Sequence, residues 1–525
     1  MKTSEDILSK IVRMRREDIE RLGLNFGVDI PSERRTGHTE FLGDAGAILE
    51  VKRASPSKGD IAPDLDPVEL ANTYAEAHAQ AVSVLTEGNF FKGSLRDLIA
   101  VADLMERRRK QGLLACAVLR KDFLLYEDEI DIAYRCGADA VLLIARILDD
   151  EQLVKMAKRA QSFDMQAFVE VRETDDFRKL QVVTKALGDA AAKTIVAGVN
   201  SRDLATFHTD PLIPAGVRHK LPAKAVFESG ILTPADADYA RSLGFTGILV
   251  GEAVAKNPPL AKDVVSSFES GSENAQGQFW KKFAEKLAER KATKKASSLV
   301  KICGITRAED GLLAAELGAD MLGFVFSTTK RLTTEEFVRS FKERLLPLKQ
   351  VQGRNDKSET PILVGVITDP NSEEGKTAIK LAQEGILDAV QLHGVAPSSL
   401  ACHREHEVRS DLSQAFPYYY AARVGTPEDF QIVADLRTHG EPRILLDAKV
   451  EGIPGGTGKT IPESLLREKA GDLPLWLAGG ITPENVGTIC EKFHPELIDV
   501  SSGVEDAPGI KNHEKMKALF NAILV

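Results

Sequence analysis

Short apolar runs recur along the first half of the chain, and stretches with helical spacing of apolar residues separate them. Residues 66–79 and 149–163 are two such stretches, and each begins with aspartate, which is typical of a helix start. The predicted strands are residues 47–52, 81–86, 113–123, 140–144, 166–171, 194–200, 225–230 and 247–251. Alternating strands and helices predict a parallel sheet. Eight units without a glycine-rich dinucleotide turn after the first strand favour a closed (β/α)8 barrel over a Rossmann sheet.

The same pattern begins again near residue 299. The predicted strands of this half are residues 299–306, 321–327, 362–368, 389–394, 418–424, 443–449, 475–480 and 497–503. The periodicity is lost at residues 351–361, which we interpret as a loop between a helix and a strand. The sequence therefore predicts a second, shorter (β/α)8 barrel of the α/β class. The two halves share little residue identity, which indicates two folds in tandem and not a short-period repeat.

A charged stretch at residues 269–298 separates the two patterns. Its apolar residues Phe279, Phe283 and Leu287 have helical spacing, so we predict a linker helix that docks one stripe on a barrel. The alternative is a surface insertion in one larger domain, but each flank carries its own complete series of strands. The expected domains are thus residues 1–268, about one barrel in length, the linker 269–298, and a second barrel at 299–525.

Composition limits the possible partners and the compartment. Apolar residues make up 43% of the 525 residues and charged residues 28%, as in ordinary globular proteins. A net charge of -10 argues against nucleic acid as a general partner, but a local site could still bind a small anion. The five cysteines have no CxxC spacing, which predicts neither a disulfide framework nor a zinc module and favours a reducing compartment.

The N-terminal segment and the hydropathy pattern bear on location. The first 18 residues form a charged amphipathic pattern without the apolar core of a signal peptide. No apolar run is long enough to span a membrane, so we expect a cytoplasmic protein without a membrane partner. Cys402, His403 and His406 could be imagined as metal ligands, but a solvated helix face is the better interpretation of these residues.

Polar residues stand at the ends of the predicted strands of the first half. In a (β/α)8 barrel the chemistry lies at the carboxyl ends of the strands. Those ends carry two lysines and several carboxylates, the set that general acid–base chemistry needs. The residues are Glu50, Lys52, Lys121, Glu170, Asn200, Arg202, Glu228 and Ser229. One such charge alone would be interpreted as a solvated loop residue. Gly230 and Gly251 would let backbone N–H groups approach a phosphate.

The motifs EVKRASPSKG, LRKDF, FVEV, GVNSRDL, FESGI and LVGEA closely resemble those of indole-3-glycerol phosphate synthases. The resemblance covers the whole first half, including an extra N-terminal helix. It implies ring closure and decarboxylation of 1-(2-carboxyphenylamino)-1-deoxyribulose 5-phosphate without a cofactor or a metal.

The resemblance also implies a role for each motif residue. Lys121 would be the general acid, Lys52 would hold the substrate carboxylate or assist proton transfer, and Glu170 would act in the dehydration step. Glu50, Asn200, Glu228 and Ser229 would orient these groups, Arg202 and Phe123 would line the anthranilate side, and Ser55, Gly230 and Gly251 would surround the phosphate. Glu252 would repel a phosphate, so we expect its side chain to turn away.

The glycine-rich segment at residues 452–460 invites a nucleotide-binding interpretation. A P-loop has glycine, four residues, and then Gly-Lys-Ser/Thr. Counting back from Gly458 places Ile453 where the first glycine is required, so the motif fails by one residue. A loop that offers backbone donors to a sugar phosphate remains the favoured interpretation.

Cys303 and Asp447 end two predicted strands of the second half. Alone, the cysteine would be interpreted as apolar filler and the aspartate as a turn residue. The surrounding motifs KICGIT, FVFSTTKR, VQLHG, LLDAKVEGIPGGTGKT, LAGGITPENV and DVSSGVEDAPGIKN closely resemble those of phosphoribosylanthranilate isomerases. That family performs an Amadori rearrangement of N-(5-phosphoribosyl)anthranilate. The resemblance makes Asp447 the general acid and Cys303 the general base.

The remaining pocket residues of the second half also follow from the resemblance. Arg331 would contact the substrate, and Gln391, His393 and Asp499 would line the pocket. Gly456, Gly480, Ser501 and Ser502 would hold the phosphate.

The two resemblances together predict consecutive steps of tryptophan biosynthesis in one chain, with anthranilate-derived sugar phosphates as ligands. We expect a monomer, since each barrel can dock on the other. One alternative is a barrel protein that binds phosphate ligands and has lost one activity, but both acid–base pairs are present. Another is a histidine-pathway sugar-phosphate isomerase. Such barrels usually use two carboxylates, so the pair Cys303 and Asp447 argues against it.

Overall fold

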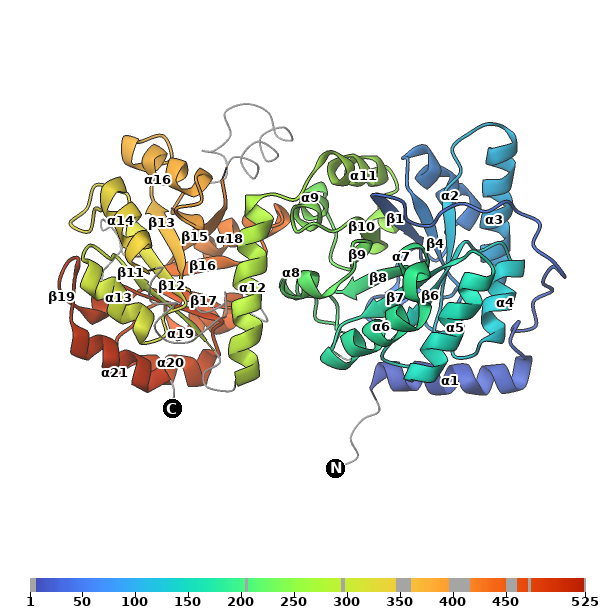
Figure 1. Cartoon of the computed structure of the whole chain (residues 1–525), viewed down its shortest axis with the longest axis horizontal. Coiled ribbons are helices and arrows are strands. Elements are labelled where there is room, and N and C mark those ends of the chain that lie inside the picture. Colours follow the sequence, from blue (N-terminus) through green and yellow to red (C-terminus); the bar gives the residue numbers. More distant parts are fainter. Residues whose placement is uncertain are drawn as a thin grey trace. The chain divides into compact units, whose positions relative to one another are not determined.

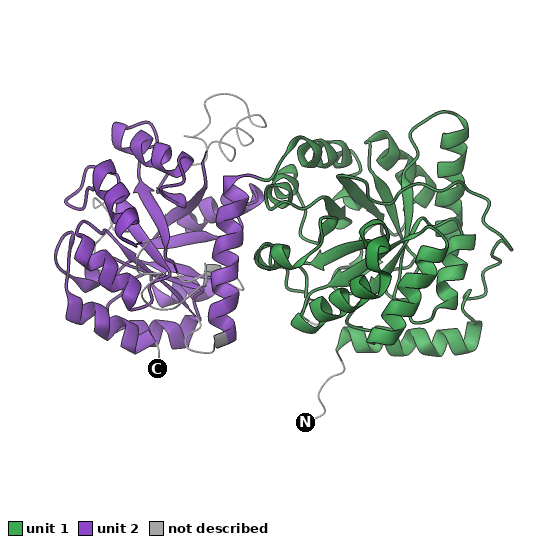
Figure 2. Ribbon diagram, in the orientation of Figure 1, with its two compact units in different colours: residues 1–273 green, residues 274–525 purple. Residues whose placement is uncertain are grey.

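A computed structural model of the chain describes residues 6–203, 206–293, 298–345, 360–395, 416–449, 460–470 and 474–523. The chain divides into two compact units, Met1–Glu273 and Asn274–Val525, which Figure 2 colours green and purple. Within the described ranges, no helix combines the length and the apolar character needed to cross a bilayer.

Eight parallel strands of the first unit close into a barrel in the order β1-β10-β9-β8-β7-β6-β5-β4 (Figure 1). Nearly every strand residue is buried, as expected where both faces of a parallel sheet are covered. The strands are β1 (Gly46–Val51), β4 (Ala81–Leu85), β5 (Ala117–Lys121), β6 (Ala140–Ile144), β7 (Gln166–Val171), β8 (Ile195–Asn200), β9 (Ala225–Glu228) and β10 (Gly247–Val250). The predicted barrel is confirmed.

Helices lie between these strands and around the barrel. They are α1 (Ile7–Leu22), α2 (Pro67–Glu76), α3 (Leu95–Lys110), α4 (Asp128–Arg135), α5 (Asp150–Ser162), α6 (Thr174–Leu187), η1 (Gly188–Ala190), α7 (Ala191–Thr194), α8 (Leu212–Val217), η2 (Arg218–Lys220), α9 (Pro234–Ser242), α10 (Glu252–Lys256) and α11 (Leu260–Ser270). A short hairpin, β2 (Ala54–Ser55) and β3 (Gly59–Asp60), follows β1. Asp66 and Asp149 accept backbone N–H groups of α2 and α5, so these aspartates are the predicted helix caps.

The second unit repeats the architecture in the order β11-β12-β13-β14-β15-β16-β17-β18. Its strands are β11 (Leu299–Cys303), β12 (Met321–Val325), β13 (Ile362–Ile367), β14 (Ala389–His393), β15 (Tyr418–Val424), β16 (Ile444–Ala448), β17 (Trp476–Ala478) and β18 (Leu497–Val500). The described helices are α13 (Ala308–Glu316), α14 (Glu335–Leu345), α16 (Glu373–Gln383), η5 (Pro427–Asp429), α18 (Phe430–Thr438), α19 (Glu463–Leu465), η6 (Leu466–Ala470), α20 (Val486–Phe493), η7 (Ser502–Val504) and α21 (His513–Ile523). The hairpin β19 (Glu505–Ala507) and β20 (Ile510–Lys511) follows β18. The second predicted barrel is confirmed as well.

Helix α12 (Ala275–Thr293) covers most of the charged stretch between the two strand patterns and belongs to the second compact unit. Phe279, Phe283 and Leu287 are buried, together with Trp280. The Phe283 ring lies 4.4 Å from the ring of Trp476, centroid to centroid. Gln276 exchanges two hydrogen bonds with the backbone of Tyr418. These contacts fix α12 against β15 and β17.

Candidate functional site

A cavity opens at the carboxyl ends of the strands of the first barrel. Of the residues singled out in this half, all but Glu228 line it: Glu50, Lys52, Ser55, Lys121, Phe123, Glu170, Asn200, Arg202, Ser229, Gly230, Gly251 and Glu252. Glu228 is buried at the end of β9 and contacts the cavity through Lys121. The fold therefore brings together side chains from most of the barrel strands.

Lys121 lies at the centre of the charged residues of this cavity. Its Nζ is 3.4 Å from a carboxylate oxygen of Glu50 and 3.3 Å from one of Glu228. Lys52 Nζ approaches the other oxygen of Glu50 at 3.3 Å. Two ammonium groups thus share one buried carboxylate. Because an unpaired charge is costly to bury, each of these groups stabilises the charged form of its partner.

The environment moves the pKa values of these groups apart. Burial alone would lower the pKa of Lys121, but Glu50 and Glu228 outweigh it and raise that pKa. The two lysines hold the pKa of Glu50 below its usual range in spite of burial. Burial, with the charge of Glu170 nearby, raises the pKa of Glu228 to about 8. Burial also raises the pKa of Glu170. The site therefore contains a firmly protonated ammonium beside one carboxyl group, that of Glu228, which can carry a proton near neutral pH.

Asn200 and Arg202 continue the site from the end of β8. Asn200 Nδ2 donates to Glu170 at 3.4 Å, and its side-chain oxygen accepts the backbone N–H of Arg202 at 3.0 Å. The Arg202 guanidinium donates to the Ser57 hydroxyl at 3.2 Å, which links the loops after β8 and β1.

The turn after β9 has an unusual backbone. Ser229 has φ 67° and Gly230 has φ 79°. A positive φ strains a residue other than glycine, and such strain is typical of functional sites. The buried Ser201 hydroxyl donates to the Ser229 carbonyl at 2.9 Å, and this bond holds the turn in place. The turn directs Ser229 and Gly230 to the cavity beside Gly251.

Glu252 lies at the edge of this region. Its carboxylate accepts a hydrogen bond from Lys256, one helical turn away, at 2.8 Å. Lys256 lowers the pKa of Glu252, although burial opposes the shift. The side chain is thus paired along α10.

The apolar side of the cavity includes residues that the sequence alone did not indicate. Ile7, Leu8 and Ile11 of α1 line it together with Phe123 and Phe91, whose ring centroids are 6.0 Å apart. The extra N-terminal helix is therefore part of the cavity wall, suited to a planar aromatic group. Apolar residues one helical turn apart in α1 were the available signal.

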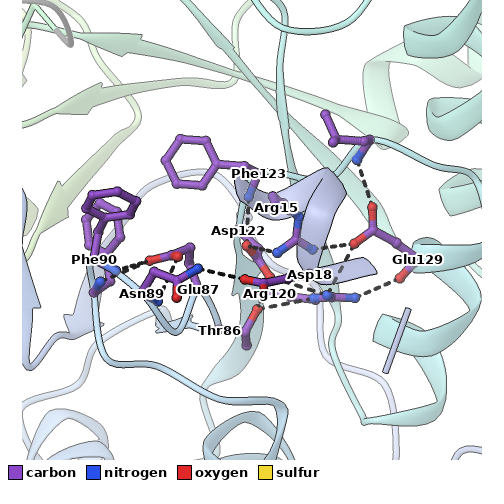
Figure 3. A network of polar contacts seen from close by, with 12 residues as sticks. Arg15, Asp18, Thr86, Glu87, Asn89, Phe90, Arg120, Asp122, Phe123 and Glu129 are labelled. Carbon is purple, nitrogen blue, oxygen red and sulfur yellow. Dashed lines mark hydrogen bonds and ion pairs between the residues drawn. The ribbon is translucent and has the colours of Figure 1, made fainter. Parts of the chain in front are cut away.

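A buried ionic network joins Arg15 to Arg120, Asp122 and Glu129 and anchors α1 to the barrel (Figure 3). Arg15 of α1 donates to Asp122 at 2.7 Å and also to Glu129. Arg120 donates to Asp122 at 3.3 Å and to the backbone carbonyl of Glu129 at 2.9 Å. Asp122 further accepts the hydroxyl of Thr86 and the backbone N–H of Phe123. Because Asp122 stands between Lys121 and Phe123, the network ties α1 to the strand end that carries both.

A second cavity lies at the carboxyl ends of the strands in the second barrel. The predicted site residues that line it are Cys303, Arg331, Gln391, His393, Asp447, Gly480, Asp499, Ser501 and Ser502. Gly456 lies outside the described residues, as does most of the glycine-rich segment 452–460. Gly479 and Gly480 both have positive φ, and they turn backbone toward the cavity after β17.

Cys303 is surrounded by cations. Burial raises the pKa of its thiol, and Lys301, Lys511 and Arg331 oppose that effect. Lys511 Nζ donates to the Cys303 carbonyl at 2.5 Å and pairs with Glu505 at 2.8 Å. Glu505 also pairs with Arg331 at 2.7 Å. The β19–β20 hairpin thereby holds both the strand end of Cys303 and the side chain of Arg331.

Asp447 lies at the end of a chain of hydrogen bonds inside the barrel. His393 Nε2 is 3.3 Å from its carboxylate. Gln391 Nε2 is 3.1 Å from His393 Nδ1, and the Gln391 oxygen accepts from the buried Lys301. Lys301 also pairs with Asp499 at 2.8 Å. The sequence analysis missed Lys301, although its position two residues before Cys303 on one strand placed it on the same face.

Comparison with known proteins identifies both halves. The family model of indole-3-glycerol phosphate synthase matches residues 10–266, and that of N-(5'phosphoribosyl)anthranilate (PRA) isomerase matches residues 300–522. The tryptophan biosynthesis protein TRP1 of Phytophthora nicotianae is 30% identical over 99% of this chain and 96% of its own length. The chain belongs to both families.

Two further relatives match most of this chain. The tryptophan biosynthesis protein TrpCF of Haemophilus influenzae is 30% identical over 91% of this chain and 86% of its own length. The multifunctional tryptophan biosynthesis protein of Schizosaccharomyces pombe is 33% identical over 91% of this chain, but the match spans only 59% of that protein. This chain thus spans about three-fifths of the length of that relative.

Proposed function

We propose that the chain catalyses two consecutive reactions of tryptophan biosynthesis. The second barrel would isomerise N-(5-phosphoribosyl)anthranilate to 1-(2-carboxyphenylamino)-1-deoxyribulose 5-phosphate. The first barrel would close and decarboxylate that product to indole-3-glycerol phosphate. The observation that supports this most is that each family's acid–base residues line one cavity at the strand ends of its own barrel.

In the isomerase step, Asp447 would protonate the furanose oxygen, so that the ring opens to a Schiff base. Cys303 would then remove the C2 proton, and the resulting enolamine would become the ketone. The cations around Cys303 favour its thiolate against the effect of burial. Arg331 and Asp499 would contact the substrate, and Gly480, Ser501 and Ser502 would hold its phosphate.

In the synthase step, Lys121 would protonate the carbonyl oxygen as the ring carbon attacks, and would assist the later loss of water. Its raised pKa keeps the ammonium protonated at neutral pH. Glu170, whose pKa burial raises, would exchange a proton in the dehydration. Lys52 would bind the substrate carboxylate that leaves as CO2, and Glu50 and Glu228 would hold Lys121 in place. The wall of α1 and Phe123 would receive the anthranilate ring.

Each step can be tested with its own substrate. Cys303→Ala should lower only the isomerase rate and Lys121→Ala only the synthase rate, each by roughly 100- to 10,000-fold. The half-buried Cys490 and the exposed Lys155 offer matched controls, and their alanine variants should keep both rates. A wild-type chain that turns over neither substrate would contradict the proposal. One substitution that abolished both rates in a folded chain would contradict the separation of the sites.

We further propose that the chain is a cytoplasmic monomer, as the sparse cysteines and the paired barrels favour. Light scattering on the purified chain tests the oligomeric state, since a dimer would double the 57.2 kDa mass.

A further inference from the structure

In the second barrel, the hydrogen bonds of Gln391 determine which way its side-chain amide faces. The buried Lys301 ammonium donates to its Oε1, and the Tyr419 hydroxyl lies 2.8 Å from the same atom. An ammonium can only donate hydrogen bonds, so the amide oxygen of Gln391 has to face it. The amide nitrogen of Gln391 is therefore the atom that faces His393.

The orientation of Gln391 determines which nitrogen of His393 carries the proton. Gln391 Nε2 lies 3.1 Å from His393 Nδ1 and can only donate. Nδ1 is then an acceptor without a proton, because a second N–H at this distance would place two donors face to face. The ring is neutral with its proton on Nε2, which lies 3.3 Å from Asp447 Oδ2. His393 thus carries its N–H on the nitrogen nearest Asp447.

The charge of His393 matters for the reaction proposed above. Asp447 has to carry a proton at the start of the isomerase step. An imidazolium beside it would form a charge-assisted bond, about twice as strong as a neutral one, and would favour the ionised carboxylate. A neutral ring adds no positive charge beside the carboxyl group. We propose that Gln391 is a positioning residue that keeps His393 neutral, with its proton on the Nε2 nearest the acid Asp447.

This inference rests on the proposed isomerase function of the second barrel. Among the residues that the structure describes, the other titratable or charged side chains near the pair are Lys301 and Cys303 on β11, Tyr419 and Arg423 on β15, and Asp499 on β18. Arg331 approaches from the loop after β12. All of these remain in the variants described next. The charge of Lys301 is already compensated by Asp499 at 2.8 Å.

Gln391→Glu tests the proposal with a side chain of nearly the same shape. The new carboxylate would still accept hydrogen bonds from Lys301 and Tyr419. It would also accept one from Nδ1 of His393, once that nitrogen carries a proton. His393 would become an imidazolium, and Asp447 would lose its proton at a lower pH. We expect the alkaline limb of the isomerase kcat profile to move down by about one pH unit, which is about tenfold in rate on that limb. KM should change little.

His393→Asn supplies the background that separates this effect from a direct one. Asparagine cannot become a cation, so adding Gln391→Glu to His393→Asn should move the profile no further. An unchanged profile in Gln391→Glu, or the same shift in the His393→Asn background, would overturn the proposal. The synthase rate of the same chain checks folding in every variant.

The tautomer can also be measured without turnover. In a chain labelled with ¹⁵N-histidine, the His393 signals are those that disappear in His393→Asn. Wild type should show the pattern of the neutral Nε2–H ring, and Gln391→Glu that of an imidazolium. An imidazolium or a Nδ1–H ring in wild type would contradict the inference. A wild-type chain without isomerase activity would instead refute the proposed function, and the spectrum would still test the tautomer.

Discussion

Replacing Arg15 by methionine should destabilise the first barrel and leave the second unchanged. The side chain is 3% exposed, and its two partners Asp122 and Glu129 are fully buried. Arg120 is the other guanidinium of the network (Figure 3), so the wild-type cluster pairs two cations with two carboxylates. Methionine keeps the apolar stem but leaves one buried negative charge without compensation.

Breaking a buried ion pair in this way typically costs about 3–5 kcal/mol. With a urea dependence of about 2–3 kcal/mol per molar, the unfolding midpoint of the first barrel should fall by about 1–2.5 M. The exposed Arg21, which pairs with Asp18 on the same helix, is the matched control. Arg21→Met should cost less than about 1 kcal/mol.

The two barrels can be followed separately. Both tryptophans of the chain, Trp280 and Trp476, lie in the second unit, so their fluorescence reports on that unit alone. Loss of synthase activity in urea reports on the first, whereas far-UV circular dichroism reports on both barrels together. Arg15→Met should shift the activity transition and leave the fluorescence transition in place. If the activity midpoint moved no more than in Arg21→Met, the buried network would not be what anchors α1.

Two further predictions follow from the sites. A Cβ atom at Gly198 would lie 2.1 Å from Glu228 Oε1 and 2.6 Å from the Phe168 ring, so Gly198→Ala should displace Glu228 from Lys121 and cost about 1–3 kcal/mol. Gly43→Ala, where nothing lies within 4 Å, should keep the synthase rate and the stability, and equal losses in both variants would contradict this reasoning. Burial raises the pKa of the Cys303 thiol, so the reactive thiolate should form only as the pH rises. The rate at which iodoacetamide inactivates the isomerase by alkylating Cys303, measured from pH 6 to 10, should therefore still increase above about 8.5, the pKa of a free thiol, and a plateau below that value would contradict it.

The strands of both barrels were predictable because their burial is nearly uniform. Residues 140–144 and 166–171 were predicted with the bounds that the structure shows. The first is a continuous apolar run, and the second is apolar except for Gln166 and Glu170. Residues 113–123 were predicted as one strand, but β5 begins at Ala117. Leu113 and Leu114 are about half exposed, because Gly112 with φ 70° ends α3 and the chain turns before the strand. The apolar character of two leucines in the sequence does not reveal such a turn.

The site residues at strand ends could be predicted from the sequence for a topological reason. Parallel strands in a closed barrel place all their carboxyl ends at one mouth, so residues as distant as Glu50 and Glu228 could be assigned to one cavity. The contacts that hold these site residues in place could not be predicted from the sequence. Arg15 meets Asp122 across 107 positions, and only the docking of α1 on the barrel defines that pair. The orientation of Gln391 likewise depends on Lys301, which is on a different strand.

Complementation between two inactive variants tests the central claim, two independent sites in one chain, most directly. Cys303→Ala and Lys121→Ala are each given N-(5-phosphoribosyl)anthranilate, alone and mixed in equal amounts, and indole-3-glycerol phosphate is measured. Each variant alone should form almost none, whereas the mixture should form it, because the free intermediate passes from one chain to the other. Full conversion by either variant alone, or none by the mixture of two folded variants, would contradict the claim.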